Sequence, residues 1–467
     1  MLFSSISFLY YFLPVVLVLY FAVPKPLKNI ILFLSSLFFY FYGEPLYCLL
    51  MLFSILSGYL HGLWIGRARG TRYARVPLVS SIVIGIGALL FFKYADFFIN
   101  NINTLFGLDI ALLRLALPLG ISFYTFQILS YTIDTYRGES RVQGSFLRFG
   151  TYVSLFPQLI AGPIVRYTTV ENLLANRRHS FADTASGVSR FITGLAKKIL
   201  IANTLGELGN TFLYLDDKTV LFYWLAAVGF MLQIYYDFSG YSDMAIGLGR
   251  IFGFRFPENF NYPYISKSIT EFWRRWHISL GMWFRNYVYI PLGGNRVSTL
   301  KWVRNILVVW FLTGFWHGAE WNFIVWGLMF ALLLLMEKWF LRDLLGKLPS
   351  PVGHFYVLLM VLLGFVLFNA GGLREGVENI RGMFGLLGIP LSSPESLYYF
   401  KSYLVVFLVA ILGATPLPAK LVQNIRSRSR GEKWVNAMEP AALMLMFLLA
   451  TGYLIDGSFN PFLYFRF

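Results

Sequence analysis

Long apolar runs, separated by short polar and basic segments, dominate the hydrophobic pattern of this chain of 467 residues. Several runs reach about 18 residues or more, which is the length that a helix needs to cross the hydrocarbon core of a bilayer. The pattern predicts an all-α polytopic membrane protein with about 10 to 12 spans. The predicted spans include residues 5–23, 29–43, 46–66, 76–94, 115–133, 220–238, 303–318, 323–340, 354–367, 397–412 and 437–454.

Three segments depart from the simple span pattern. Residues 97–113 carry a weaker apolar pattern that predicts a short helix. Residues 152–166 are apolar but contain two prolines and one glycine. They predict a broken or re-entrant segment, which is tolerated only where the segment is buried in protein or lines water. Residues 177–205 are amphipathic and basic, which predicts a helix at the cytoplasmic interface.

A polar stretch at residues 257–268 precedes a clear helix signal. Ser268 and Glu271 match a capping box, in which each side chain satisfies a backbone N–H of the first turn. Apolar residues then recur at three- and four-residue spacing, which predicts one continuous helix before the turn at Gly293. His277 flanks this apolar stripe, so we expect its side chain to face protein or lipid. The stripe consists of Ile269, Phe272, Trp276, Leu280, Trp283 and Tyr287.

The distribution of basic residues sets the expected topology. The loop at residues 67–75 carries four arginines and no acidic residue, which marks it as cytoplasmic. Lys25 and Lys28 fall on the same side when the N-terminus is outside, and residues 420–433 are strongly basic as well. We therefore expect a multi-pass protein of the inner (cytoplasmic) membrane, with its N-terminus outside and its basic loops in contact with anionic membrane lipids.

The composition supports the membrane assignment and excludes other classes of protein. Hydrophobic residues make up 57% of the chain and charged residues 13%, whereas a soluble domain has about 25% charged residues. The formal net charge of +16 does not indicate binding to nucleic acid, because the Lys and Arg residues lie mostly at loop positions that set topology. The single cysteine, Cys48, excludes an intrachain disulfide.

His317 is the first candidate for chemistry, because an ionisable side chain inside a predicted span marks a functional site by default. Imidazole titrates near neutral pH and can remove a proton from an alcohol, as acyl transfer to a hydroxyl requires. The structural alternative is a histidine that forms hydrogen bonds between helices. We expect Thr313, His317 and Trp321 to share one helix face, and Gly314 and Gly318 to let another backbone approach.

The other polar candidates are less specific. For His277, a role in the site and an interfacial position beside Arg274 fit the pattern equally well. Asp237 and Asp243 lie at or near membrane depth, where a carboxylate needs a partner. We expect them to form ion pairs with Arg250 or Arg274, or to orient a histidine. The chain has no HExxH motif and no Cys/His cluster, so we predict no metal site.

Five stretches together carry a family resemblance. They are SFYTFQILSYTIDTYRG from residue 122, YVSLFPQLIAGPIVR from 152, YYDFSGYSDMAIGLGRIFGF from 235, PENFNYPYISKSITEFWRRWHISLGMWFRNYVYIPLGGNR from 257 and FWHGAEWNFIVWG from 315. With these stretches the chain resembles the membrane-bound O-acyltransferase (MBOAT) family, and within it the branch that O-acetylates alginate. They cover most of residues 120–330, which we expect to be the catalytic core of a single transmembrane domain over residues 1–467.

The resemblance implies a ring of tilted helices around a central tunnel, with re-entrant segments. The family's central histidine corresponds to His317, and its second, more variable polar position corresponds to His277. The implied donor is acetyl-CoA or an acyl-carrier thioester, with no bound cofactor. A separate extracytoplasmic partner, similar to an acetyltransferase or esterase, would complete transfer to the polysaccharide acceptor. One departure is Asn286, where the family pattern has aspartate, and this lost charge weakens the expectation of a carrier-protein contact near Arg285.

We therefore expect a membrane O-acyltransferase that passes an acetyl group from a cytoplasmic thioester to an extracellular polysaccharide such as alginate. His317 would be the general base, and His277 would orient the substrate or accept a second proton. The residues that we expect to bind substrate are Trp316, Trp276, Asp237 and Arg285. The alternatives are transfer of D-alanyl or another acyl group to a teichoic-acid-type or cell-wall polymer, a proton-coupled transporter, and a non-catalytic scaffold.

Overall fold

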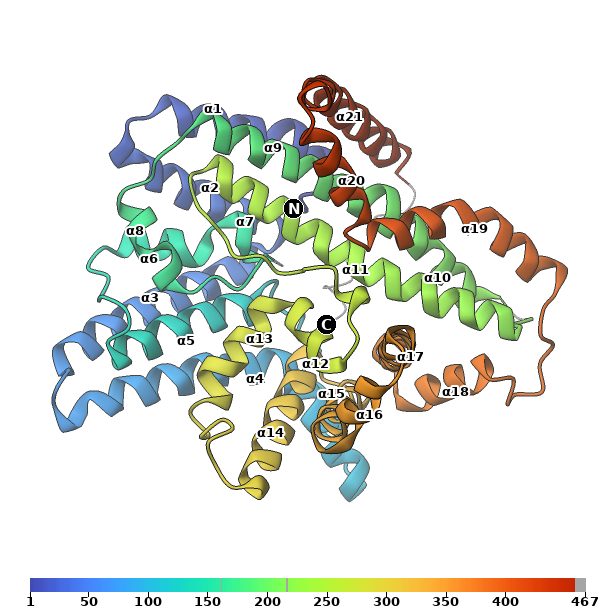
Figure 1. Ribbon diagram of the computed structural model, residues 1–467. Coiled ribbons are helices and arrows are strands. Elements are labelled where there is room, and N and C mark those ends of the chain that lie inside the picture. Colours follow the sequence, from blue (N-terminus) through green and yellow to red (C-terminus); the bar gives the residue numbers. More distant parts are fainter. Residues whose placement is uncertain (161, 216, 458–467) are drawn as a thin grey trace. The chain divides into compact units, whose positions relative to one another are not determined.

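Helices form all of the regular secondary structure in the computed structural model, which describes residues 1–160, 162–215 and 217–457 (Figure 1). Eight helical segments in these ranges are long and apolar enough to cross a membrane. The prediction of an all-α polytopic membrane protein is therefore confirmed. The eight segments contain α2 (Lys28–Gly43), α3 (Pro45–Ala68), α4 (Arg75–Phe106), α11 (Val220–Ile251), α15 (Trp321–Met336), α17 (Ser350–Asn369), α19 (Pro394–Gly413) and α21 (Ser429–Asp456).

Several predicted spans differ from the helices in the structure. The first apolar run forms a π-helical turn and then α1 (Leu13–Ala22), which together are shorter than a membrane-length helix. α5 (Ile121–Arg137) begins later than residue 115, because Gly120 adopts a left-handed backbone with φ of 71°. Residues 97–113 do not form a separate helix, since α4 continues without a break to Phe106. The central tunnel and the re-entrant geometry stay predictions.

Contacts between residues divide the described chain into two units. The first unit comprises Met1–Phe191 and Met244–Pro257. The second comprises Ile192–Asp243 and the chain from Glu258 onward. The expectation of one transmembrane domain stays a prediction.

Close helix packing organises the first unit. Gly58 on α3 lies against Ile128 of α5, and Gly62 lies against Tyr131 of the same helix. Because glycine has no side chain, the two helices approach closely along this pair. α5 also carries the buried Asp134, whose carboxylate forms an ion pair with the guanidinium of Arg166 at 2.8 Å.

The broken segment predicted at residues 152–166 is confirmed for its described part, and residue 161 lies outside the described residues. α6 (Phe146–Ser154) ends before Leu155, and a short helix, α7 (Phe156–Leu159), follows with Pro157 in its first turn. Proline fits there because the first helical N–H groups have no intrahelical acceptor. Most of the segment is buried, as non-helical backbone in a membrane protein requires.

The second unit is built around α14 (Thr299–His317) and α15, which pack directly against each other (Figure 1). Gly314 lies against the carbonyl of Phe323, and Gly327 lies against the carbonyl of Trp310. The expected close approach at Gly314 is therefore present. A large hydrophobic cluster lies alongside this pair and includes residues of α11 and α17.

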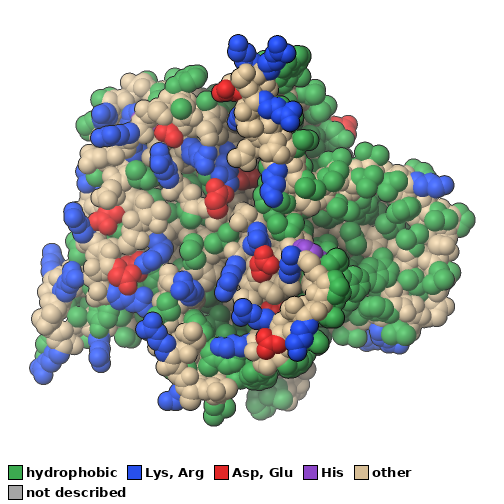
Figure 2. Space-filling view, viewed as in Figure 1, with side chains coloured by type: hydrophobic (Ala, Val, Ile, Leu, Met, Phe, Trp, Pro, Cys, Tyr) green, Lys and Arg blue, Asp and Glu red, His purple; other side chains and the backbone are tan. Residues whose placement is uncertain are grey.

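The surface of the second unit has apolar and basic regions. Exposed leucine, valine and isoleucine side chains cover much of α19, as contact with lipid requires. Figure 2 shows basic side chains gathered near α20 (Leu417–Arg426) and the start of α21. These are the residues of the predicted cytoplasmic segment 420–433. The group consists of Lys420, Arg426, Arg428, Arg430 and Lys433.

Candidate active site

A helix break places His277, and the continuous helix predicted through residues 269–287 is wrong. α12 (Ile269–Arg275) ends before Trp276, which is extended, and α13 (Ile278–Phe284) starts after His277. His277 itself adopts a left-handed backbone with φ of 43°. Such a backbone is costly for a residue with a side chain, and residues that keep it cluster at functional sites.

Asn259, from the polar stretch before α12, stabilises this break. Its backbone carbonyl accepts a hydrogen bond from the Ile278 N–H at 3.0 Å. Its side-chain Oδ1 accepts from the N–H and the hydroxyl of Ser279, at 3.2 and 2.9 Å, and lies 3.2 Å from His277 Nδ1. Its Nδ2 donates to the hydroxyl of Ser242 on α11 at 3.2 Å. One buried asparagine therefore holds the start of α13 and the imidazole ring together.

The environment of His277 is closed and largely apolar. The side chain is 2% exposed, and its ring stands edge-on to Phe238 with the ring centroids 4.6 Å apart. Nε2 is buried and has no hydrogen-bond partner among the residues that the structure describes. Burial lowers the pKa of His277 to about 3, because an apolar site disfavours the charged imidazolium. His277 is therefore neutral at physiological pH.

His317 is the last residue of α14 and lies among aromatic side chains. It is 8% exposed, and its ring stands edge-on to Trp326 and to Phe368, each with ring centroids 5.2 Å apart. The prediction that Trp321 shares its helix face is wrong. α14 ends at His317 and a new helix, α15, begins at Trp321, so the three- and four-residue spacing does not continue across this junction.

The N-terminus of α12 is held by a carboxylate from the end of α15. Ser268 caps the helix as predicted, accepting from the Glu271 N–H at 3.0 Å, but the capping box is incomplete, because the Glu271 carboxylate accepts from the Lys267 N–H and not from that of Ser268. Glu337, which is 3% exposed, accepts from the N–H groups of Ile269 and Thr270 and from the Thr270 hydroxyl. These N–H groups have no acceptor within the helix, so the carboxylate accepts their hydrogen bonds. Its negative charge also interacts favourably with the positive end of the helix dipole.

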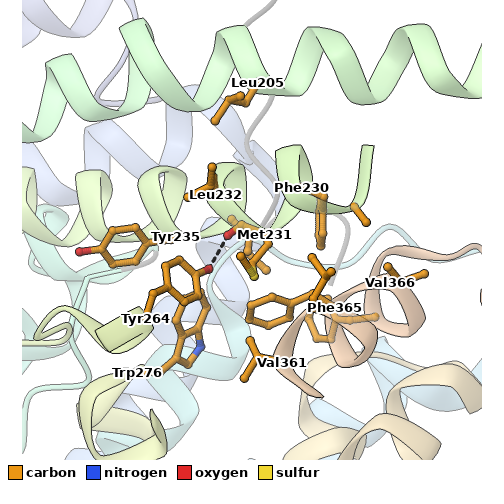
Figure 3. Close-up of a cluster of buried hydrophobic side chains, with 14 of the residues drawn as sticks. Leu205, Phe230, Met231, Leu232, Tyr235, Tyr264, Trp276, Val361, Phe365 and Val366 are labelled. Carbon is orange, nitrogen blue, oxygen red and sulfur yellow. Dashed lines mark hydrogen bonds between the residues drawn. The ribbon is translucent and has the colours of Figure 1, made fainter. Parts of the chain in front are cut away.

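Both histidines line one cavity of about 760 Å³ within the second unit. Trp276 lines the same cavity, and it also packs against the hydrophobic cluster shown in Figure 3. There its ring lies 5.1 Å from that of Phe365, and the neighbouring Tyr264 donates a hydrogen bond to the carbonyl of Met231. The cluster thus fixes Trp276 in the wall. Three cationic side chains, Arg274, Arg285 and Lys338, also line the cavity.

Comparison with known proteins places this arrangement in a family. The sequence pattern of the membrane-bound O-acyltransferase family matches residues 137–344. A probable alginate O-acetylase of Pseudomonas putida is 38% identical to the chain, and the alignment covers 100% of both proteins. The chain belongs to the membrane-bound O-acyltransferase family. The resemblance expected from the sequence is confirmed, and the protein is a multi-pass membrane O-acyltransferase.

Two further relatives act on cell-envelope polymers, as their names state. A peptidoglycan O-acetyltransferase of Helicobacter pylori is 35% identical, over 84% of this chain and 81% of that protein. A teichoic acid D-alanyltransferase of Bacillus subtilis is 31% identical over 241 residues, which are 47% of this chain and 60% of that protein.

The remaining predicted site residues of the O-acyltransferase occupy different positions. Trp316 contacts both histidines, with ring centroids 6.1 Å from His277 and 5.0 Å from His317, but is not among the residues that line the cavity. Asp237 is not among the residues that line the cavity. Its carboxylate forms a buried ion pair with Lys198 at 2.5 Å, and Asp243 pairs with Lys197 at 2.6 Å. The prediction that Arg250 or Arg274 pairs with these carboxylates is therefore wrong, because both partners are lysines.

These lysines also change the interpretation of the basic segment. The expected interfacial helix at residues 177–205 consists of α9 (Phe181–Ala196) and a π-helical stretch, Lys197–Asn203. Lys198 is 1% exposed in this stretch, so it is not at an aqueous interface. It neutralises a carboxylate on α11, which removes the cost of an unpaired buried charge.

Sequence reasoning missed Asn259, Glu337 and Lys338. Asn259 lies in the polar stretch PENFN, and this concentration of polar residues beside apolar runs was the available signal. Glu337 ends a long apolar run, where a carboxylate needs a partner. Within the part of the chain that the structure describes, no group of three or more His, Cys, Asp or Glu side chains is arranged to hold a metal ion.

Proposed function

We propose that this O-acyltransferase moves acetyl groups from a cytoplasmic thioester donor across the membrane for the O-acetylation of an extracellular polysaccharide such as alginate. The observation that carries the proposal is the shared cavity, which is lined both by His277 from the break between α12 and α13 and by His317 from the end of α14. The similarity to a probable alginate O-acetylase over the whole chain supports acetyl as the acyl group.

His317 is the general base in this proposal. It takes the proton from the attacking hydroxyl while the oxygen bonds to the carbonyl carbon of the thioester. The bond between carbon and sulfur then breaks, and the thiolate leaves with the proton that the imidazolium returns. Hydroxyl and thioester thus become ester and thiol, and His317 ends in its starting state.

Aromatic side chains keep the reaction away from water. Trp276 forms part of the cavity wall, and Trp316 lies against both histidine rings. Exclusion of water suppresses hydrolysis of the thioester, which competes with transfer to the hydroxyl. Asp237 lies outside the cavity lining and binds Lys198, so its part in substrate binding is indirect, through support of α11 next to Phe238 and His277.

The cationic side chains of the cavity favour an anionic donor. Arg274, Arg285 and Lys338 would attract the phosphate groups of acetyl-CoA or an acidic carrier protein that bears the thioester. In this proposal the protein lies in the inner membrane with its N-terminus outside. Its basic segments are then cytoplasmic and contact anionic lipids. A separate extracytoplasmic partner, similar to an acetyltransferase or esterase, would deliver the acetyl group to the polymer.

Peptidoglycan is the second candidate acceptor, because the relative from Helicobacter pylori aligns over most of both chains. The test measures acyl groups released from extracellular polysaccharide and from peptidoglycan of the host, with wild type, His317→Ala and His61→Ala at matched membrane levels. His61 is a buried histidine that does not line the cavity, so its variant is the matched control.

We expect acetate to disappear from one polymer with His317→Ala and to persist with His61→Ala. The polymer that loses acetate identifies the acceptor, and release of D-alanine would instead support the teichoic-acid alternative. Unchanged acylation with His317→Ala would contradict the proposal and leave the transporter or scaffold interpretation.

A further inference from the structure

We infer that Asn259 is a positioning residue that fixes His277, a residue of the cavity lining, in the tautomer with the proton on Nδ1, which leaves Nε2 without a proton. This inference is drawn from the hydrogen bonds among four buried residues of the second unit, which are Ser242, Asn259, His277 and Ser279. Its catalytic meaning rests on the proposed function, but the tautomer itself can be measured without any activity.

The orientation of the Asn259 amide follows from its backbone neighbour. The N–H of Ser279 lies 3.2 Å from the side-chain oxygen of Asn259. A backbone N–H only donates, so the atom facing it must be the oxygen and not the NH₂ group. The NH₂ group then faces the hydroxyl of Ser242 at 3.2 Å, which accepts from it. Neither end of the amide is ambiguous.

The tautomer of His277 follows from the amide orientation. Asn259 Oδ1 lies 3.2 Å from His277 Nδ1, and a carbonyl oxygen only accepts, so Nδ1 must carry the proton. A neutral imidazole carries one N–H, and therefore Nε2 has a free lone pair. That atom is buried and has no hydrogen-bond partner within the described part of the chain, and the residue lines the cavity.

The same asparagine also fixes the position of the ring. Its backbone carbonyl accepts from Ile278 N–H, which ties down the helix break and the left-handed His277. Phe238 stands at 88° to the imidazole, with the ring centroids 4.6 Å apart, and this contact restricts rotation of the ring. The bare Nε2 is thus held in a fixed direction, and in the proposed reaction it would accept a hydrogen bond from a hydroxyl of the acceptor that reaches it.

The test is ¹⁵N NMR of purified full-length protein labelled at histidine, since the two ring nitrogens differ in shift with and without a proton. The signals of His277 are those that vanish in His277→Gln. We expect a protonated Nδ1 and a bare Nε2 in the wild type at neutral pH. Asn259→Leu, which removes the acceptor at similar size, should give a mixture of both tautomers. Protonated Nε2 in the wild type would overturn the inference, as would an unchanged Nδ1–H in Asn259→Leu.

Asn259→Asp is the second variant and keeps the inference testable where Asn259→Leu does not fold. Its carboxylate still accepts from Nδ1 and from Ser279, so the tautomer should persist. The added negative charge favours the imidazolium, so the titration of His277 should move to higher pH. Absence of that movement would show that the two side chains are not in contact.

The activity measurement separates this inference from the proposed function. We expect Asn259→Leu to lower acyl transfer about 100-fold, as misplacement of a reacting group can do, and Asn259→Asp to retain most of the activity at high pH. If His317→Ala leaves acylation intact while NMR shows the expected tautomer, the proposed function fails and the positioning role stands. If NMR shows the other tautomer while His317→Ala abolishes acylation, the positioning role fails alone.

Discussion

His277 and His317 line one cavity but are held by different kinds of contact. His277 lies in a break between two short helices, where Asn259 holds the backbone and Nδ1. His317 ends a long helix between aromatic rings. The first arrangement fixes orientation through polar contacts, and the second surrounds the proposed base with an apolar wall. The comparison teaches that one histidine is suited to binding and orienting, and the other to moving a proton.

The largest expected effect is that of His317→Ala. Removing a general base costs about 100- to 10,000-fold in rate. The measurement is acetyl transfer in membrane vesicles that contain the host's partner proteins, with the amount of enzyme matched by immunoblot. His61→Ala is again the control for loss of a buried histidine. A rate within a few-fold of wild type would assign the proton transfer to another group.

His277→Ala is expected to have a smaller effect in the same vesicles. Loss of correct positioning can cost about 100-fold, so the variant should retain measurable transfer. Because the two histidines act on one substrate, their effects should not add, and the double variant should fall little below His317→Ala alone. Fully multiplicative losses would mean that the two residues act in independent steps.

The difference between the two histidines also shows what the sequence can and cannot predict. Membrane-length helices follow from local composition, so most spans and the broken segment near Pro157 were predictable. The helix break at His277 was not, because the apolar stripe continues through residues 269–287 at helical spacing. The hydrogen bonds that break the helix come from Asn259, 18 residues earlier than His277. A contact at that separation leaves no periodic signal.

The same reasoning applies to charged partners. Asp237 and Asp243 were expected to pair, and they do, but the sequence did not identify Lys197 and Lys198 as their partners. These residues are about 40 positions away, and no local spacing rule connects such distant side chains. His317 stands out as a candidate in the sequence because an ionisable group at the end of an apolar run is informative by itself, and its role stays a prediction.

Glu337→Ala tests how α12 supports the His277 side of the cavity. The variant leaves the buried N–H groups of Ile269 and Thr270 without their acceptor, which should cost about 1–3 kcal/mol of stability. The measurement is thermal unfolding of the purified protein in detergent. Glu337→Gln keeps one oxygen acceptor and should lose less, and Glu378→Ala, an exposed residue on α18 (Leu373–Met383), is the control. Equal melting temperatures for all three variants would show that the carboxylate does not stabilise α12.

The smallest expected effect is on the pH dependence of the reaction. Burial lowers the pKa of His277 to about 3, so this ring stays neutral as pH falls through the range in which the unfolded histidine, with a pKa near 6.5, becomes charged. The contribution of the neutral His277 to the stability of the folded protein is complete above the pKa of the unfolded histidine, and it is lost as the pH falls toward 3.

The fall in the rate of acyl transfer at low pH should therefore come from protonation of the general base and not of His277. We expect His277→Gln to lower the rate of acyl transfer while leaving unchanged the pH at which the rate falls to half. We expect Asn259→Asp to move the titration of His277 to higher pH, toward the pH range of the rate measurements. The measurement is the pH profile of transfer under single-turnover conditions, which separates chemistry from release of product. A shift of about one pH unit in His277→Gln would mean that His277 exchanges protons during turnover, and the division of roles between the two histidines would be reversed.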